Sequence, residues 1–304
     1  MTYQAAWLKG VQVQEGDRPC EHRYQIVRRF CEQFSRPFTV LDIGANLAYF
    51  SLRLTEEFDC TAVAIEGSQS GEACFDLLTR NENPRVILLQ RDITLDELRQ
   101  VAECEHFDLV LALSITHHLP GSFEERLDVF RSLGDHLILE LAHDTESGHD
   151  PRKAYVLPAD AQILGYGEFY DNPSVQRAVA LLSRPKTHLS KRGLGDQRDD
   201  LFLTITSTFR DKRVQFHSKP EERPWHRGIN LTTYLTLGGV WPTKAMIVRQ
   251  LEAITLDGTH GDIYPWNVIL QGDAVQLIDA ADPNHSEQAD DARDMRDLIE
   301  WLRG

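Results

Sequence analysis

Short apolar runs alternate with amphipathic segments through the first half of the chain. The runs have the length and composition of buried strands, and they lie at residues 38–43, 61–65, 85–90, 107–113 and 136–141. Segments with apolar residues at helical spacing separate them. This alternation predicts a mostly parallel sheet that is covered by helices on both faces. The expected fold class is therefore a doubly wound α/β fold.

The pattern becomes less regular beyond the fifth run. A short element is expected at residues 161–164, and a helix at residues 173–183, where Pro173 would start the helix. Residues 201–209 are rich in β-branched side chains and predict a strand. We expect this strand to pair antiparallel with residues 186–190 and so to complete the sheet.

Composition changes sharply at residue 210. Residues 210–227 contain many Arg, Lys, His, Pro and Glu residues and few apolar ones. We interpret this segment as a linker between a domain at residues 1–209 and a C-terminal extension at residues 210–304. Its basic residues give an alternative interpretation, a patch that binds a phosphorylated acceptor or nucleic acid. The net charge of −15 argues against broad non-specific nucleic-acid binding by the whole chain.

Composition also limits the compartment. No run approaches the roughly 18–20 apolar residues that a bilayer-spanning helix needs, and the first residues lack the basic start and apolar core of a signal peptide. The five cysteines are an odd number without metal-ligand spacing. We therefore expect a cytoplasmic protein with reduced thiols, no membrane span and no metal site in its main domain.

Candidate ligand chemistry begins where the first strand ends. The strand leads into a helix through a tight turn, Asp42-Ile-Gly44-Ala-Asn46-Leu-Ala48. Such a turn places backbone N–H groups and a helix N-terminus beside a crevice above the sheet. Acidic residues also follow the second and third strands, at Glu66 and Asp92. Because parallel strands end at one edge of a sheet, these carboxyl groups predict a site for a polar ligand.

This arrangement resembles the class I S-adenosylmethionine-dependent methyltransferases over roughly residues 20–209. The resemblance implies a Rossmann-like, seven-stranded sheet of the methyltransferase type and S-adenosyl-L-methionine as the cofactor. The first motif of that family matches residues 42–48, although Gly44 is the one glycine retained. Asn46 and Ala48 occupy the positions of the later two glycines. Their absence also argues against NAD, the main rival, because a pyrophosphate would need close backbone approach.

The resemblance implies a role for each acid. Asp42 would offset the positive charge of the cofactor's amino-acid part, and Glu66 would accept hydrogen bonds from both ribose hydroxyls. Asp92 would contact the adenine amino group, with Ile93 beside the ring. The alternative for each carboxylate is a solvated position at the end of a strand. The remaining residues expected to bind the cofactor are Gly44, Ala45, Asn46 and Ser114.

The fourth strand is followed by Ser-Ile-Thr-His-His, where this family places groups that face the transferred methyl. His117 and His118 are candidates for a general base or for a grip on an anionic acceptor. A structural histidine is the alternative for either one. The Asn/Asp-Pro-Pro-aromatic motif of amine-methylating DNA enzymes is absent here, and no paired cysteines suggest carbon-5 pyrimidine chemistry. Oxygen, including phosphate oxygen, is therefore the favoured acceptor atom.

The C-terminal extension carries a second resemblance. Residues 259–270 and 275–282 resemble the catalytic and metal-binding loops of aminoglycoside-phosphotransferase-like and protein kinases. By this resemblance Asp262 matches the catalytic aspartate, Asn267 the metal-binding asparagine and Asp279 the second metal-binding aspartate. No Gly-rich loop or strand-borne lysine precedes them within the extension. We therefore expect an inactive kinase-like remnant, with binding of ATP and magnesium as the less favoured alternative.

The combination is similar to the bifunctional methyltransferase–kinase proteins that terminate O-antigen polysaccharides, in which the acceptor is a phosphate. This resemblance implies a methyltransferase that acts on an oxygen of a phosphorylated glycan, nucleotide or nucleic-acid end. Two alternatives stay open. One is a non-catalytic S-adenosylmethionine-binding protein whose kinase-like tail docks a partner, and the other is a residual ATP-dependent phosphotransferase.

Overall fold

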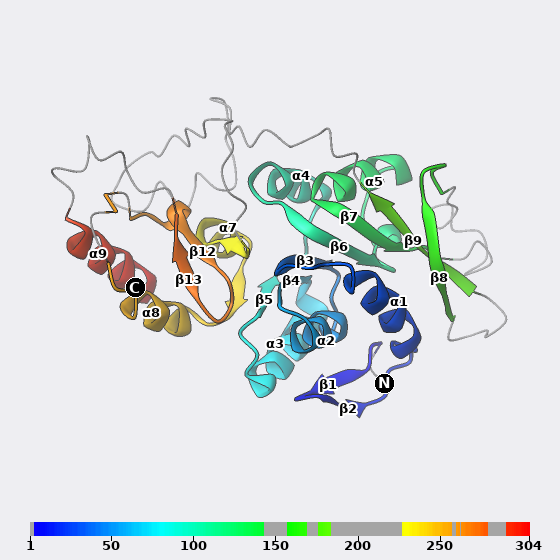
Figure 1. Ribbon diagram of the computed structural model, residues 1–304, viewed down its shortest axis with the longest axis horizontal. Helices are drawn as coiled ribbons and strands as arrows, with labels where there is room; N and C mark the ends of the chain where they lie inside the picture. Colours follow the sequence, from blue (N-terminus) through cyan, green and yellow to red (C-terminus); the bar gives the residue numbers. More distant parts are fainter. Residues whose placement is uncertain are drawn as a thin grey trace.

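The computed structural model describes residues 3–142, 157–168, 176–183, 227–256, 260–261, 263–278 and 290–304. Within these residues a sheet of eight strands dominates the molecule, in the order β11-β5-β4-β3-β6-β7-β9-β8 (Figure 1). The five central strands, from β5 to β7, are parallel, and β11, β9 and β8 are antiparallel to their neighbours. Their bounds are β3 Phe38–Ile43, β4 Cys60–Glu66, β5 Val86–Gln90, β6 Phe107–Leu113, β7 Gly134–Glu140, β8 Gln162–Glu168, β9 Gln176–Ser183 and β11 Gly239–Trp241.

Helices cover both faces of this sheet. The helices α1, α2 and α3 pack on one face, and α4 and α5 pack on the other (Figure 1). Their bounds are α1 Glu21–Cys31, α2 Tyr49–Glu57, α3 Ser68–Asn81, α4 Leu95–Cys104 and α5 Phe123–Ser132. Both α4 and α5 begin with a capping box, in which Thr94 or Ser122 exchanges hydrogen bonds with a glutamate three residues later. The expected doubly wound α/β fold is therefore confirmed.

One expected helix is wrong. Residues 176–183 form the strand β9, which pairs antiparallel with β7 and with β8. Ala and Leu give this segment helical propensity, but Val179, Leu181 and Leu182 are buried, and pairing on both sides overrides local preference. The short element expected at 161–164 proves to be the start of β8.

Among the described residues, the antiparallel pair on this side of the sheet is thus β8 and β9. The pair expected at residues 186–190 and 201–209 lies outside the described residues. Most of the basic segment at 210–227 lies outside them too. Its last residue, Arg227, forms an ion pair with Asp59 at 2.5 Å.

A small hairpin precedes the main sheet. Its strands are β1 (Ala6–Leu8) and β2 (Val11–Gln14). Trp7 anchors the hairpin, because its ring stacks under the Arg53 guanidinium and its indole N–H donates to Glu56 at 2.7 Å. The backbone N–H of Lys9 donates to the Asn81 side chain at the end of α3. The hairpin therefore ties α2 and α3 together on the face away from α4 and α5.

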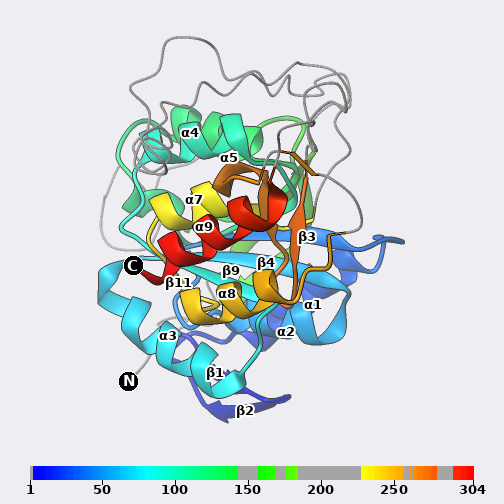
Figure 2. The same ribbon diagram turned by 90° about the vertical axis from the view of Figure 1, so that its left-hand side faces the viewer.

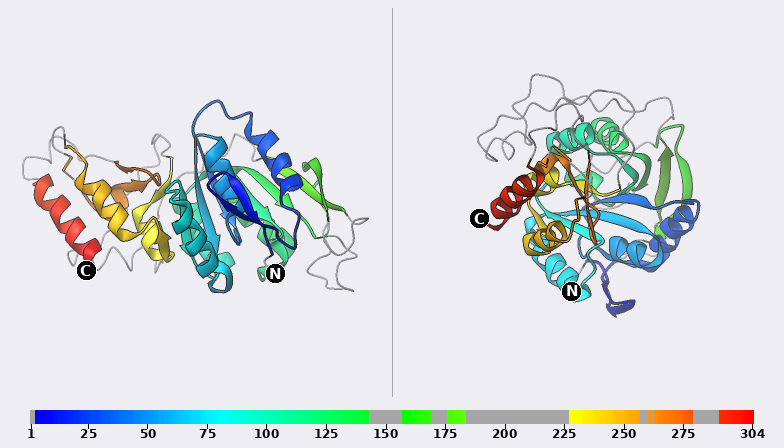
Figure 3. Two further views of the ribbon diagram at one scale, coloured as in Figure 1. Left: turned by 90° about the horizontal axis from the view of Figure 1, so that it is seen from below. Right: turned by 60° about the vertical axis from the view of Figure 1, so that its left-hand side comes forward.

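The extension lies beside β5, at the edge of the sheet opposite β8 (Figures 1, 2 and 3). Its described residues form a three-stranded antiparallel sheet in the order β10-β12-β13, the helices α7, α8 and α9, and the short 3-10 helix η3. The bounds are β10 Ile229–Asn230, α7 Leu231–Thr236, α8 Lys244–Glu252, η3 Pro265–Asn267, β12 Val268–Leu270, β13 Val275–Leu277 and α9 Asp291–Arg303. No described helix is both long and apolar enough to cross a membrane.

The extension is joined to the main domain by strand pairing and by a common core. Its strand β11 pairs with β5, and the Trp241 indole N–H donates to the carbonyl of Asn83 at 3.0 Å. The Thr61 hydroxyl donates to the Gln271 carbonyl at 2.9 Å. Side chains from both parts also fill one continuous apolar cluster. The division at residue 210 stays a prediction, while the packing makes the two parts mutually dependent.

This packing predicts a large effect of Trp241→Ala on stability. The indole is 5% exposed and packs in the main-domain core, so its removal should lower the free energy of unfolding by about 3–5 kcal/mol. Urea unfolding followed by circular dichroism measures this. Val11→Ala, at a 58% exposed position, is the control and should change stability by no more than about 0.5 kcal/mol. Equal losses in the two variants would contradict the shared core.

Candidate functional site

The carboxyl ends of β3, β4, β5 and β6 lie together at one end of the sheet, which we call the strand-end edge (Figure 1). Asp42 lies near the end of β3, and Glu66 is the last residue of β4. Glu66 pairs with Gln90, the last residue of β5, and Asp92 follows two residues later. Ser114 comes directly after β6. The structure therefore brings the predicted acids and Ser114 to the same edge.

Asp42 is 3% exposed, and its carboxylate accepts a hydrogen bond from the Ser51 hydroxyl at 2.8 Å. Burial raises the pKa of Asp42 from its usual 3.8 to about 7, and the negative charge of Glu66 adds to the rise, while the Ser51 hydrogen bond opposes it. Loss of solvation makes the ionised form of the Asp42 carboxyl group unfavourable. A cation placed beside Asp42 would reverse this penalty.

The turn after β3 has a left-handed backbone at alternate residues. Gly44 has a φ of 72°, Asn46 a φ of 53° and Ala48 a φ of 54°. Gly44 is required for a second reason, because a Cβ there would lie 2.7 Å from the side chain of Ile115. Ala48 keeps the conformation at a cost of roughly 1–2 kcal/mol. The turn thus has the backbone form that glycine favours at all three positions where the related motif carries glycine.

Asn46 and Glu66 are joined by a hydrogen bond. The backbone N–H of Asn46 donates to Glu66 Oε2 at 2.6 Å, and the Asn46 side-chain amide donates to Ser70 at 3.2 Å. The amide oxygen of Asn46 is buried and accepts no hydrogen bond from any described residue. A buried acceptor without a donor costs about 1–3 kcal/mol, so this atom is suited to a ligand donor. Its neighbour Ala45 is fully buried in the same turn.

Glu66 and Asp92 lie next to each other where β4 and β5 end. Burial raises the pKa of Glu66, and the negative charge of Asp92 raises it further, against hydrogen bonds from the backbone of Asn46 and Gly67. Asp92 packs across the Gly67 backbone so closely that a Cβ on Gly67 would collide with its carboxylate. Asp92 itself is exposed, and Ile93 is half-buried against the apolar core. Two acids and one apolar side chain thus line this part of the edge.

Ser114 belongs to a buried polar cluster that the sequence did not reveal. Its hydroxyl donates to Glu140 at 2.7 Å and accepts from Arg177 at 2.5 Å. Glu140 is fully buried and also forms ion pairs with Arg23 at 2.9 Å and Arg18 at 3.7 Å. The signal available was a glutamate at the end of an apolar run. Because the hydroxyl hydrogen of Ser114 is directed at Glu140, Ser114 presents its backbone rather than this proton to a ligand.

The histidine pair lies in a 3-10 turn, η1 (Thr116–His118), which begins two residues after Ser114. His117 is half-buried and His118 is exposed, with ring centroids 4.2 Å apart. The buried guanidinium of Arg126 in α5 holds this turn by donating to the carbonyls of Thr116 at 2.6 Å and Leu119 at 3.1 Å. Arg126 was not anticipated from the sequence. The turn places both imidazoles just beyond the strand edge.

The kinase-like residues are partly described. Asn267 is buried at the end of η3, and its carbonyl accepts from the backbone N–H of Ile278 at 2.9 Å. Ile278 directly precedes Asp279 in the sequence, but Asp279 and Asp262 themselves lie outside the described residues. Among those described, no group of three or more His, Cys, Asp or Glu side chains is placed to hold a metal ion.

Asp291 organises the loop that precedes Asp262, a role not evident in the sequence. From the first turn of α9, its carboxylate accepts from the backbone N–H groups of His260 at 2.5 Å and Gly261 at 2.7 Å. The only sequence signal was an acidic start to the last amphipathic helix. Residues 260–261 are therefore held in place by α9.

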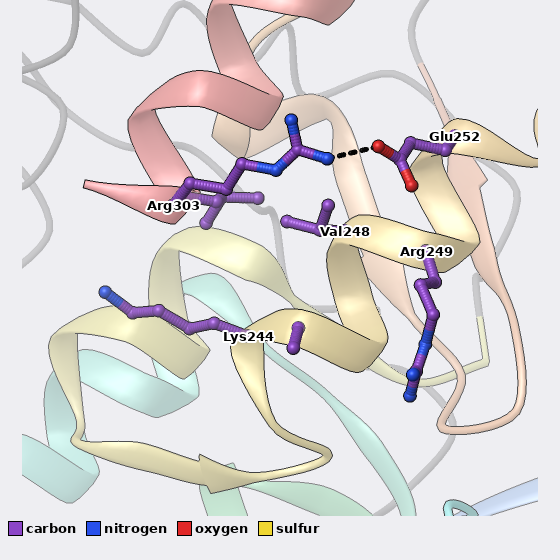
Figure 4. A pocket seen from close by; sticks show the side chains of 7 residues that line it. Lys244, Val248, Arg249, Glu252 and Arg303 are labelled. Atoms are coloured by element: carbon purple, nitrogen blue, oxygen red, sulfur yellow. Dashed lines mark hydrogen bonds and ion pairs between the residues drawn. The ribbon is translucent and has the colours of Figure 1, made fainter.

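A cavity of about 420 Å³ lies between α8 and α9 (Figure 4). Val248 and Leu302 contribute apolar surface, and the ion pair of Arg303 with Glu252 lies on its rim. Figure 4 shows the Lys244 side chain pointing away from the Arg303 pair. The cavity belongs to the extension and is lined by none of the predicted site residues. The strand-end edge is therefore the candidate functional site.

The doubly wound sheet, the acids at its strand ends and the appended loops resemble class I methyltransferases that carry a kinase-like part. Sequence comparison confirms this resemblance. Over 188 residues the chain is 29% identical to WbdD of Escherichia coli, the O-antigen chain terminator bifunctional methyltransferase/kinase. That match covers 56% of this chain and 26% of WbdD, so the chain spans about a quarter of that curated relative. No family model matches the chain.

Comparison with solved structures also matched WbdD, together with a second protein. A WbdD structure with a kinase inhibitor is 21% identical, with a TM-score of 0.47, and the match covers 87% of this chain and 76% of that one. The N-terminal domain of EvdMO1, in the presence of SAH and D-fucose, is 14% identical, with a TM-score of 0.43 and coverage of 60% and 91%.

The burial of Asp42 predicts a pH-dependent stability. Because folding raises the pKa of Asp42, ionisation of this group does not destabilise the protein below pH 3.8. The free-energy cost grows as the pH rises to about 7 and is constant above that. Asp42→Asn removes this cost, so the stability difference between the variant and the natural protein should grow by about 2–3 kcal/mol from pH 5 to pH 8. Urea unfolding at both pH values measures it. Asp96→Asn, at an exposed carboxylate, should show no such gain, and a flat Asp42→Asn difference would refute the raised pKa.

Proposed function

We propose that the chain is an S-adenosyl-L-methionine-dependent methyltransferase that methylates an oxygen atom. The observation that carries the proposal is the set of three carboxyl groups, Asp42, Glu66 and Asp92, at consecutive strand ends beside the left-handed turn at residues 44–48. In open α/β sheets, ligands bind in the crevice outside the carboxyl ends of the strands. The sequence match to a methyltransferase/kinase supports the same reaction class.

The residues present fit this cofactor chemically. The cofactor carries an ammonium group, and Asp42 supplies a buried carboxylate whose ionisation a cation would favour. The orphan amide oxygen of Asn46 needs a donor, which an ammonium or a hydroxyl provides. The carboxylate of Glu66 accepts from the backbone N–H groups of Asn46 and Gly67. Because a carboxylate has about four acceptor sites, Glu66 can also accept from a ribose hydroxyl. Each unsatisfied group at the edge thus has a counterpart on the ligand.

The adenine end would lie over the end of β5. The carboxylate of Asp92 would accept from the exocyclic amine, and Ile93 would cover one face of the ring. Gly44 allows the turn to lie against Ile115, because a Cβ there would be 2.7 Å from that side chain. Gly44 and Ala45 would then contact the ligand through their backbone. When bound, the cofactor supplies an electrophilic methyl group on a sulfonium. The protein's own contribution is to position that group and the acceptor oxygen in line.

His117 and His118 would act on the acceptor. A hydroxyl acceptor must lose a proton as its oxygen bonds to the methyl carbon, and an imidazole near neutral pKa can take it. A phosphate acceptor is already anionic, and a protonated imidazole would then hold it. The relative WbdD is described as an O-antigen chain terminator. A phosphorylated glycan is accordingly the acceptor class that we propose first, with a phosphorylated nucleotide or nucleic-acid end next.

Titration calorimetry with S-adenosylmethionine tests the cofactor. Asp92→Asn and Glu66→Gln should each weaken binding by roughly tenfold, because each loses a charge-assisted hydrogen bond of about 1.5 kcal/mol. Glu82→Gln, which changes an exposed carboxylate paired with Lys9, is the matched control and should bind normally. An absence of binding by the unaltered protein would overturn the proposal. Tight binding of ATP with magnesium in its place would favour the phosphotransferase.

Transfer of labelled methyl from the cofactor into fractionated host extract tests the reaction and identifies the acceptor. His117→Ala should lower turnover by about 100-fold or more if the imidazole is the base, with cofactor affinity unchanged. His106→Ala, which removes a histidine paired with Asp135 away from the site, should leave turnover intact. Cofactor binding without label in any fraction would instead indicate a binding protein whose tail docks a partner.

A further inference from the structure

The extension completes the β5 edge of the main sheet. Strand β11 runs antiparallel to β5, with Gly239 opposite Leu89 and Trp241 opposite Leu88. The carbonyl of Gly238 accepts from the backbone N–H of Gln90 at 3.0 Å. Without β11, β5 would pair on one side only, and a strand with a free edge frays at its ends. The extension therefore holds the end of β5 from which Asp92 projects.

The end of β5 is also tied to the rest of the strand edge. Gln90 lies opposite Glu66 in the β4–β5 ladder, and the backbone N–H of Arg91 donates to the Glu66 carbonyl at 2.8 Å. The Gln90 side chain packs against Gly71, where a Cβ would lie 2.6 Å from its Cγ. Gly71 is adjacent to Ser70, the partner of the Asn46 side chain. A shift at Gln90 would consequently reach both acids and the turn after β3.

We propose that strand β11 is a positioning element for the cofactor, which sets the Glu66–Asp92 pair for the adenosine part. This inference rests on the proposed function. Trp241 fixes β11 at the far end of β5 through its hydrogen bond to Asn83, and Gly238 fixes it at the ligand end through Gln90. The kinase-like extension thereby takes part in methyl-donor binding without touching the donor, whether or not it binds a nucleotide itself.

Two glycines of the extension provide matched probes of this role. Gly238 has a φ of 69°, and a Cβ there would lie 3.0 Å from the carbonyl of Gln90, at the ligand end of β5. Gly272 has a φ of 91°, and a Cβ there would collide with the carbonyl of Pro84, just before β5 begins. Alanine at either position strains the backbone and pushes on the same strand. Only Gly238 does so beside the predicted site.

The test compares binding of S-adenosylhomocysteine and S-inosylhomocysteine, which lacks the adenine amino group, by calorimetry. Gly238→Ala should weaken S-adenosylhomocysteine binding by about fivefold or more and S-inosylhomocysteine binding much less, so that discrimination between the ligands falls. Gly272→Ala should lower the unfolding midpoint but leave both affinities within about twofold. In an Asp92→Asn background, Gly238→Ala should have no further selective effect.

The outcomes separate the two proposals. If the unaltered protein binds no S-adenosylhomocysteine, the proposed function fails. If it binds, but Gly238→Ala keeps its discrimination or both alanine variants weaken both ligands equally, the positioning role is refuted. Should Gly238→Ala not fold, hydrogen exchange of the unaltered protein decides. By linkage, S-adenosylhomocysteine should slow exchange of the Gln90 amide more than that of amides in the β12–β13 hairpin, and equal effects would refute the role.

Discussion

The hydrogen bond from the Asn46 backbone N–H to Glu66 is the interaction on which the strand-end edge depends. It joins the turn after β3 to the last residue of β4 at 2.6 Å. The turn can supply that N–H because Gly44, Asn46 and Ala48 all have left-handed backbones. Asparagine tolerates this conformation, whereas alanine pays for it with strain. Two of the three glycines of the motif are thus replaced by Asn46 and Ala48, but the backbone has the same left-handed conformation at all three positions.

Carboxylates gather at this edge at an electrostatic cost. Asp42 is buried and Glu66 is half-buried. The negative charge of Glu66 raises the pKa of Asp42, and that of Asp92 raises the pKa of Glu66. A purely structural role would favour neutral or paired groups at such positions. Elsewhere the chain does pair its buried charges, since Glu140 contacts Arg23 and Arg18. The two clusters thus differ in charge balance, because Glu140 is paired with two guanidinium groups, whereas the pKa values of Asp42 and Glu66 are raised by burial and by neighbouring carboxylates.

The sequence predicted the strands and acids that show in the local pattern of apolar and polar residues. Buried parallel strands are continuous apolar runs, so β3 to β7 were recognisable, and the acids that follow β3, β4 and β5 were visible because they interrupt those runs. Strand β9 was mistaken for a helix because its Ala and Leu content has no strand signature without its partners. The cluster of Ser114, Glu140 and Arg177 joins residues far apart in the sequence. A glutamate at the end of an apolar run marks Glu140 locally, but it does not identify the partners of Glu140.

The extension shows the same limit on a larger scale. The composition of the extension differs from that of the main domain. Its strand β11, however, has three residues, too few for a periodic pattern that would predict its pairing with β5. Its side chains and those of the main domain fill one core. Separation of the two parts would expose a large apolar surface on each. The loop residues around Asn267 and Asp291 are held by hydrogen bonds within the extension, from the backbone N–H groups of His260 and Gly261 to Asp291 and from that of Ile278 to the Asn267 carbonyl. The extension therefore has a structural role in the fold that does not depend on kinase chemistry.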